Sequence, residues 1–308
     1  MNSEQAVLRN SIVATVLLAA ASLMFGLTIR SNAILFDGIY SLVDAAMTGL
    51  AFVVARLIAS STAADAARRP FHERFTMGFW HLEPIVLGLN GTLMTGAAVY
   101  ALVNAVSALL AGGHPLHFGA AMIFEGSATL AAIGMAVYVR VVNRSMRSHL
   151  VALDGKAWGV SVALGLALVM AFVVGFVIKG GALHRFAPYV DPAALALIAL
   201  AVIPVPLGTI RRALADILLV TPQGMKDHVD AVARDAVRRL GFLSHRAYVA
   251  RVGRGSQIEL FFIVPPNWPA RRLEEWDALR DEIGRALGPD SPDRWLTIVF
   301  TTDPEWAN

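Results

Sequence analysis

Apolar residues fill six long stretches of the chain, and short polar segments separate them. The stretches cover residues 12–29, 33–58, 82–110, 118–139, 150–178 and 192–207. About 20 apolar residues are enough for a helix to cross the hydrocarbon core of a bilayer. The sequence therefore predicts a membrane domain of about six spanning helices over residues 1–215. The last stretch is short, and Pro204 and Pro206 interrupt it because proline removes a helical hydrogen bond.

The pattern changes after Pro222. Residues 225–240 have apolar positions three or four apart, which predicts an amphipathic helix. Two strands are predicted at 247–252 and 257–264, joined by a turn at Gly253-Arg254-Gly255, followed by a helix at 273–287 and a strand at 295–301. The order α-β-β-α-β is typical of a small α+β domain, so we expect a cytoplasmic C-terminal domain over residues 222–308.

Composition agrees with a membrane protein. Hydrophobic residues make up 56% of the chain, only 16% are charged, and the mean hydropathy is +0.59, whereas soluble domains carry about 25% charged residues. The net charge of +3 comes from Lys and Arg dispersed among short loops, which does not suggest a nucleic-acid partner. The chain has no Cys, so any metal ion must be held by oxygen or imidazole ligands.

Arginine-rich loops alternate with loops that carry fewer basic residues. The predicted inner loops contain Arg56, Arg68, Arg69 and Arg74, then Arg140, Arg144 and Arg147, and finally Arg211 and Arg212. Loops rich in Lys and Arg stay on the cytoplasmic side of a membrane. We therefore expect a multi-pass protein of the plasma membrane, of the bacterial inner-membrane type, with both termini in the cytoplasm.

Acidic residues inside the second apolar stretch are the first candidates for function. Asp37, Tyr40 and Asp44 follow one another at helical spacing, so they share one face of the helix. A carboxylate at membrane depth costs roughly 2.5–3.5 kcal/mol on insertion scales, and such residues usually mark a functional site. The alternative is that both carboxylates lie near a helix end and are hydrated from the aqueous side.

Further polar residues lie at comparable positions in other stretches. Asp154 begins the fifth stretch, Glu125 lies within the fourth and Asn90 within the third. Glu125 is either an oxygen ligand or a neutral, hydrogen-bonded packing residue, and Asn90 is either a ligand or a residue that joins two helices. His81 and Glu83 begin the third stretch, where they either lead ions inward or cap the helix.

Several short motifs occur in a recognisable order. They are Ser-Asn-Ala-Ile-Leu-Phe-Asp at 31–37, Gly78 followed by His-Leu-Glu-Pro at 81–84, Tyr-Val-Asp-Pro at 189–192, and Leu218-Leu219 before Pro222. With the six apolar stretches and the α+β tail, they resemble the cation diffusion facilitator, or cation efflux, family, of which this chain looks like a divergent member. The resemblance implies a ferredoxin-like tail, a homodimer in membrane lipid, and export of a divalent cation of the Zn, Co, Cd, Fe or Mn class by proton antiport. It implies no enzymatic activity and no cofactor, since the metal ion is the substrate.

The resemblance also places the metal ligands. Family members hold the ion with two ligands one turn apart on the second span and two on the fifth, and here these positions are Tyr40, Asp44, Ala157 and Ser161. Only Asp44 is a strong ligand. An all-oxygen cluster therefore suits this chain better than a zinc site, and it favours Mn²⁺, Mg²⁺ or Fe²⁺. Its expected members are Asp37, Tyr40, Asp44, Asp154 and Ser161, with Asn90 and Glu125 as accessory donors.

Two further expectations follow from the departures at these positions. Ala157 and Ser161 favour an alternative function, a non-transporting membrane sensor or scaffold that kept the fold and lost the metal path. In the tail, the resemblance places a regulatory ligand at His245, but the neighbouring strands offer no second His. We therefore expect the tail to dimerise without a full metal cluster. No hydrolase triad, phosphate-binding loop or His-Glu-x-x-His segment indicates an enzyme.

Overall fold

A computed structural model describes residues 4–61, 78–146 and 149–307 of the chain. The predicted inner-loop arginines Arg68, Arg69, Arg74 and Arg147 lie outside these residues. The chain forms two compact units. One contains residues up to Gly49 and Leu89–Gly208, and the other contains Leu50–Gly88 and Thr209–Asn308. The long helices α2 and α3 each contribute residues to both units.

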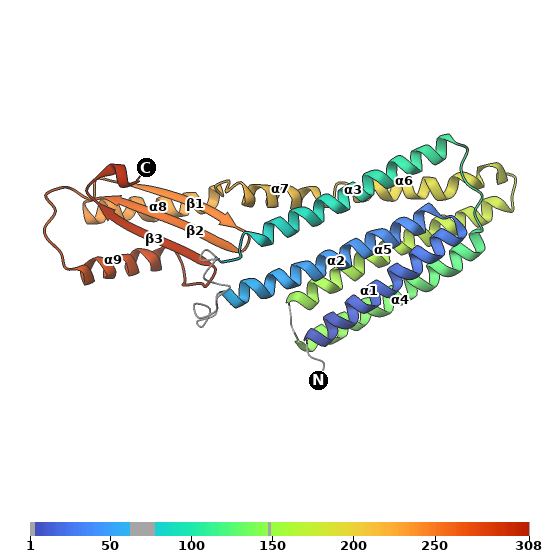
Figure 1. Ribbon diagram of the computed structural model, residues 1–308, viewed down its shortest axis with the longest axis horizontal. Coiled ribbons are helices and arrows are strands. Elements are labelled where there is room, and N and C mark those ends of the chain that lie inside the picture. Colours follow the sequence, from blue (N-terminus) through green and yellow to red (C-terminus); the bar gives the residue numbers. More distant parts are fainter. Residues whose placement is uncertain (1–3, 62–77, 147–148, 308) are drawn as a thin grey trace. The chain divides into compact units, whose positions relative to one another are not determined.

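The first unit is a bundle of long apolar helices (Figure 1). They are α1 (Glu4–Ile29), α2 (Asn32–Ser61), α3 (Leu82–Leu110), α4 (Phe118–Met146), α5 (His149–Lys179) and α6 (Val190–Val202), and a short 3₁₀ helix, η3 (His184–Tyr189), precedes α6. Six segments of the described chain are long and apolar enough to cross a membrane, the last of them running from His184 to Ile217. This confirms the predicted class of an α-helical membrane protein.

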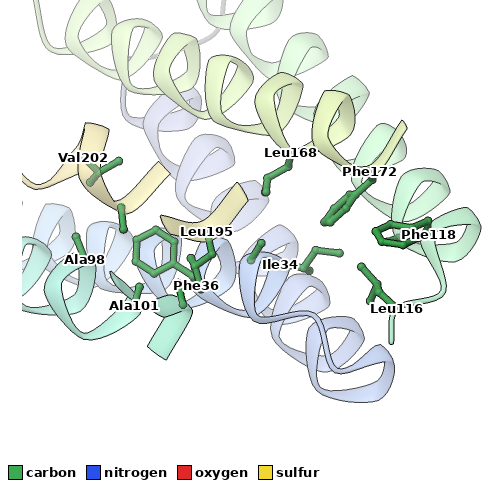
Figure 2. Close-up of a cluster of buried hydrophobic side chains, with 14 of the residues drawn as sticks. Ile34, Phe36, Ala98, Ala101, Leu116, Phe118, Leu168, Phe172, Leu195 and Val202 are labelled. Atoms are coloured by element: carbon green, nitrogen blue, oxygen red, sulfur yellow. The ribbon is translucent and has the colours of Figure 1, made fainter. Parts of the chain in front are cut away.

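Apolar side chains lie both inside the bundle and on its outer surface. Figure 2 shows part of the core, where Phe36, Phe118, Phe172 and Leu195 come from four different helices and are each at most 7% exposed. On the outside, side chains such as Leu130 and Met170 remain 69% and 67% exposed. A helix that is apolar on all sides suits a lipid environment, so the exposed residues need no protein partner.

Small residues bring α4 and α5 close together. A Cβ atom added to Gly175 of α5 would overlap the Phe118 ring of α4, and one added to Gly155 would lie 3.3 Å from Val139 Cγ1. Membrane helices commonly pack at small residues. The hydrophobic effect contributes little to their association in lipid, so close van der Waals contact between the backbones becomes important.

A buried carboxylate fixes the beginning of α2. Asp191 of α6 is 1% exposed, and it accepts hydrogen bonds from the Ser31 hydroxyl at 2.6 Å and the Asn32 backbone N–H at 3.0 Å. The Ser31 hydroxyl in turn accepts a bond from the Ile34 backbone N–H at 3.3 Å. A carboxylate at a helix N-terminus satisfies free N–H groups and complements the helix dipole, so α6 caps α2.

The sixth predicted stretch differs in detail from the structure. The sequence predicts one segment over 192–207, whereas α6 ends at Val202, a turn follows, and a further helix, α7, runs from Leu207 to Ile217. Pro204 and Pro206 lie in the turn, where their missing N–H groups break no helical hydrogen bond. The helical chain therefore continues beyond the predicted end, and α7 carries Arg211 and Arg212.

The C-terminal part has the predicted α-β-β-α-β order. It comprises α8 (Gln223–Leu240), β1 (Ser244–Val252), β2 (Gly255–Ile263), α9 (Leu273–Ala286) and β3 (Arg294–Thr301). The sheet order is β1-β2-β3, with β1 and β2 antiparallel and β2 and β3 parallel. Its core includes Ala233, Leu260, Phe262 and Ile283, none more than 2% exposed. This confirms the predicted α+β class of the tail.

The β1–β2 turn contacts residues that begin α3, within the second unit. Val252 pairs with Gly255, so the loop has two residues, and Gly253 adopts φ 62°, as tight hairpin turns often require. A Cβ atom on Gly253 would lie 2.9 Å from the Trp80 carbonyl oxygen, and one on Gly255 would lie 2.6 Å from Trp80 Cε3. The two glycines therefore allow the turn to lie directly against Trp80.

Two ion pairs hold the same hairpin. Arg254 Nε lies 2.9 Å from a Glu83 carboxylate oxygen, and Arg251 Nε lies 2.9 Å from Asp216 Oδ1 of α7. Asp216 is only 13% exposed. The hairpin thereby joins the tail to the beginning of α3 and to the end of α7.

We expect Gly255→Ala to destabilise the protein, because its methyl group would overlap the Trp80 ring. Overpacking of this kind typically costs about 1–3 kcal/mol. The melting temperature of the purified full chain in detergent should fall, measured by tryptophan fluorescence. Gly224→Ala is the matched control, since no atom lies within 4 Å of its added methyl group. Equal melting temperatures for the two variants would contradict the described packing.

Candidate intramembrane cation site

The face of α2 predicted from the sequence points into the bundle. Asp37 accepts a hydrogen bond from Ser22 of α1. Tyr40 is half-buried, its ring centroid lies 5.7 Å from that of Phe36, and its hydroxyl is near enough to Asp44 to interact with it electrostatically. The helix thus holds its two carboxylates and its phenol among neighbouring helices, as the cost of charge in lipid requires.

Asp44 interacts electrostatically with Asp154 of α5. Their two carboxylates lie close enough to repel one another. The Ser11 hydroxyl of α1 donates a hydrogen bond to Asp154 Oδ1 at 2.8 Å, and Trp158 Nε1 donates one to the Ser11 oxygen at 2.7 Å. Asp154 Oδ2 is buried and has no hydrogen-bond partner among the described residues. Buried oxygens without a donor are rare in proteins, so this one is available to a cation.

A second pair of carboxylates, Asp37 of α2 and Glu125 of α4, lies within electrostatic range of each other. Glu125 is 2% exposed and interacts electrostatically with Asp37. Within the described chain, neither Glu125 Oε2 nor the Thr129 hydroxyl has a hydrogen-bond partner. Gly165 of α5 provides their space, because a Cβ atom there would overlap the Thr129 hydroxyl and lie 3.4 Å from Glu125 Oε1. This pocket of oxygens therefore exists because residue 165 has no side chain.

The structure divides the expected cluster into these two pairs. The sequence predicts a single oxygen cluster, but in the structure Asp154 interacts with Asp44, and Asp37 interacts with Glu125. No three His, Asp or Glu side chains of the described residues come together closely enough to hold a metal ion. Each pair supplies two carboxylates, which a bound ion would complete with hydroxyl or water oxygens.

The two ligand positions on α5 lie outside both pairs. Ser161 is exposed, and its hydroxyl donates a 3.3 Å hydrogen bond to the Ala157 carbonyl of its own helix. Ala157 is exposed as well and has no ligand atom. Neither residue contributes to the arrangement of carboxylates in this chain.

The accessory candidates are dispersed. Asn90 Oδ1 of α3 is buried without a hydrogen-bond partner in the described part of the chain, and His81 is exposed. Glu83, expected to guide ions or to cap the helix, forms the ion pair with Arg254 of the tail. It therefore belongs to the contact between α3 and the hairpin.

In the tail, His245 Nε2 lies 3.4 Å from Asp230 Oδ1. Partial burial alone would raise the pKa of Asp230, but the hydrogen bonds and charges of Lys226 and His245 outweigh it and hold the pKa below its usual value. His245 is thus part of a small charged network on α8 and β1.

Four residues of the site were not predicted from the sequence. Ser11, Ser22 and Thr129 are at most 5% exposed, and Trp158 is 4% exposed. Their hydroxyl and indole groups bind or surround the carboxylates. The one available signal was the presence of hydroxyl side chains in otherwise apolar helices, where they commonly bond between helices.

The fold and the site together define a multi-pass membrane protein that holds carboxylates inside a helical bundle, as ion-transporting proteins do. The profile of the cation efflux transmembrane domain matches residues 8–218. The chain belongs to the cation efflux family and is a cation transporter, as the sequence motifs predicted. No curated protein matches the chain significantly.

We expect Ser11→Ala to destabilise the bundle. The change leaves Asp154 without its donor and the Trp158 indole without its acceptor, and an unsatisfied buried polar group typically costs about 1–3 kcal/mol. The melting temperature of the purified protein should fall. Ser127→Ala is the matched control, since this exposed serine of α4 donates a hydrogen bond to the Phe124 carbonyl of its own helix. A Ser11→Ala variant as stable as Ser127→Ala would show that the hydroxyl does not support Asp154.

Proposed function

We propose that this protein exports a divalent metal cation from the cytoplasm and that the ion binds between Asp44 and Asp154. The observation that carries the proposal is the juxtaposition of two carboxylates on α2 and α5, with a buried Asp154 oxygen that lacks a donor among the described residues. Two buried like charges repel, and a divalent cation between them removes the repulsion. We infer that the Tyr40 hydroxyl, which interacts electrostatically with Asp44, adds a neutral oxygen donor.

Asp37 and Glu125 form a second binding position on the same path. Asp37 precedes Asp44 by about two helical turns, or roughly 10 Å along the axis of α2. Oxygen ligands contact Mg²⁺ or Ca²⁺ at about 2.0–2.6 Å, so one ion cannot bind to both pairs at once. We infer that the ion passes from one pair to the other. Carboxylates bind protons as well as metal ions, which supports proton antiport.

The chemistry of the donors favours particular ions. All the candidate groups in the two pairs are carboxylate, phenol or hydroxyl oxygens. Oxygen donors suit Mn²⁺, Fe²⁺ or Mg²⁺, whereas zinc sites usually include His or Cys ligands. We therefore propose Mn²⁺ or Fe²⁺ as the first substrates to test.

We propose that the protein works in the plasma membrane as a homodimer, with both termini and the tail in the cytoplasm. The Arg residues of α4 and α7 support this orientation by the charge rule for membrane loops. The sheet face opposite the core of the tail supports a dimer, because it presents Tyr248 and Trp295 at 44% and 39% exposure. A second copy could cover this aromatic surface.

One observation favours a second function. Ala157 and Ser161 occupy the α5 ligand positions of the family, and both are exposed and supply no free side-chain ligand. A protein that kept the fold without transport would act as a membrane sensor or scaffold. Transport measurements separate this alternative from the first proposal.

We expect Asp44→Asn and Asp154→Asn each to reduce metal transport at least about tenfold. Loss of a residue that only hydrogen-bonds to a metal ligand already lowers affinity or activity by about 10- to 100-fold, and loss of a ligand should cost no less. Uptake of Mn²⁺, Fe²⁺, Co²⁺, Zn²⁺, Cd²⁺ and Mg²⁺ into proteoliposomes with an imposed proton gradient measures this effect. Asp235→Asn is the matched control, because this carboxylate lies on the exposed surface of α8. No uptake of any ion by folded wild-type protein would favour the sensor or scaffold.

We also expect the double substitution Ala157→His and Ser161→Asp to shift selectivity toward Zn²⁺. The change adds an imidazole and a carboxylate to α5 at the family's ligand positions, and imidazole favours zinc. The ratio of Zn²⁺ to Mn²⁺ uptake should rise relative to wild type. An unchanged ratio, from a double variant that still transports Mn²⁺, would place these positions away from the ion path.

A further inference from the structure

A cavity of about 370 Å³ lies between the last turns of α4 and the first turns of α5, apart from both carboxylate pairs. Arg140, Asn143 and Arg144 line it from α4, and Lys156 lines it from α5. None of the described residues that line it is acidic. Its volume falls within the range of about 300–1,000 Å³ that small-molecule sites occupy.

The positive charges of this cavity have no counter-charge in the described chain. Arg140, Arg144 and Lys156 form no ion pair within 4.0 Å with any carboxylate that the structure describes. Three cations around one cavity repel each other, and an anion between them would turn this repulsion into attraction. The cavity is therefore suited to a negatively charged group.

The backbone of α5 positions one of the three cations. A Cβ atom on Gly159 would lie 3.6 Å from an Arg140 guanidinium nitrogen, and one on Gly155 would lie 3.9 Å from Arg140 Cγ. Arg140 thus extends along the two glycines of the neighbouring helix. Val139 and Val151 form a floor that is 0% exposed. The cavity combines cationic walls with an apolar base.

Its depth matches the headgroup region of a bilayer. Arg140 lies about 33 Å along α4 from Phe118, at 1.5 Å per residue, and the hydrocarbon core is about 30 Å thick. Val137 and Val141, which flank Arg140 on the outer surface of α4, are 53% and 57% exposed. A molecule bound in the cavity would therefore have lipid-facing apolar surface beside it.

We propose that this cavity binds the phosphate group of an anionic phospholipid. Arg140 offers planar, paired donors that suit phosphate oxygens, and Lys156 and Arg144 add positive charge. The acyl chains would lie against the exposed valines of α4. Soluble phosphate compounds share the same chemistry, but the depth of the cavity and its apolar surroundings favour the lipid. The site is distinct from the metal path and does not depend on the ion transported.

The test compares lipid binding by the purified full chain in neutral detergent. Phosphatidylglycerol and phosphatidylcholine with identical acyl chains are titrated, and binding is followed by native mass spectrometry and by the shift in melting temperature. We expect the wild type to prefer phosphatidylglycerol. The double substitution Arg140→Gln and Lys156→Gln should weaken its apparent affinity for that lipid at least about tenfold. Arg211→Gln removes an exposed charge from α7 and should keep the preference.

Two results would overturn the proposal. One is equal binding of phosphatidylglycerol by the wild type and the double variant. The other is stabilisation of the wild type by inorganic phosphate or glycerol 3-phosphate to the same extent as by the lipid, which would assign the cavity to a soluble anion. If the double variant does not fold, Lys156→Gln and Arg140→Lys take its place, and each should bind phosphatidylglycerol more weakly than the Arg211→Gln control.

Discussion

The cost of negative charge in a lipid bilayer governs this structure. Asp37, Asp44, Glu125 and Asp154 all lie on helices long and apolar enough to span a membrane, and none of the four is fully exposed. Burying them requires space and hydrogen-bond donors between the helices. Gly165 leaves the space around Glu125, and hydroxyl groups from α1 bind Asp37 and Asp154. Contacts among α1, α2, α4 and α5 meet this requirement.

The class of fold could be predicted from the sequence because its signals are local. Six apolar stretches and the 3.6- and 2-residue periods of the tail predict the helices and strands without knowledge of their neighbours. The shared face of Asp37, Tyr40 and Asp44 on α2 could be predicted from their spacing in the same way. Which carboxylates interact between helices could not be predicted, because helical spacing fixes the face of one helix but not its axial register against another. Asp154 therefore interacts with Asp44, while Asp37, seven residues earlier on α2, interacts with Glu125.

Other parts of the site carry no sequence pattern at all. A serine in an apolar helix usually bonds to its own backbone, as Ser127 and Ser161 do. Only the structure distinguishes these residues from Ser11, which binds a carboxylate on another helix. The role of Glu83 could not be predicted from the sequence either, because its partner Arg254 is 171 residues away in the chain. Arg254 comes close to Glu83 because the glycines of its turn permit close contact.

The cap on α2 has a mechanical consequence. Asp191 of α6 holds Ser31 and the Asn32 N–H group, so the first turn of α2 cannot rotate freely about its axis. A rotation by one residue would turn Asp37 and Asp44 by about 100° and carry both off the inner face. The cap therefore sets the angular position of both carboxylates from a distance. A movement of α2 that exposes Asp44 first to one side of the membrane and then to the other must therefore do one of two things. It must break these hydrogen bonds, or it must move α6 together with α2 as a rigid body.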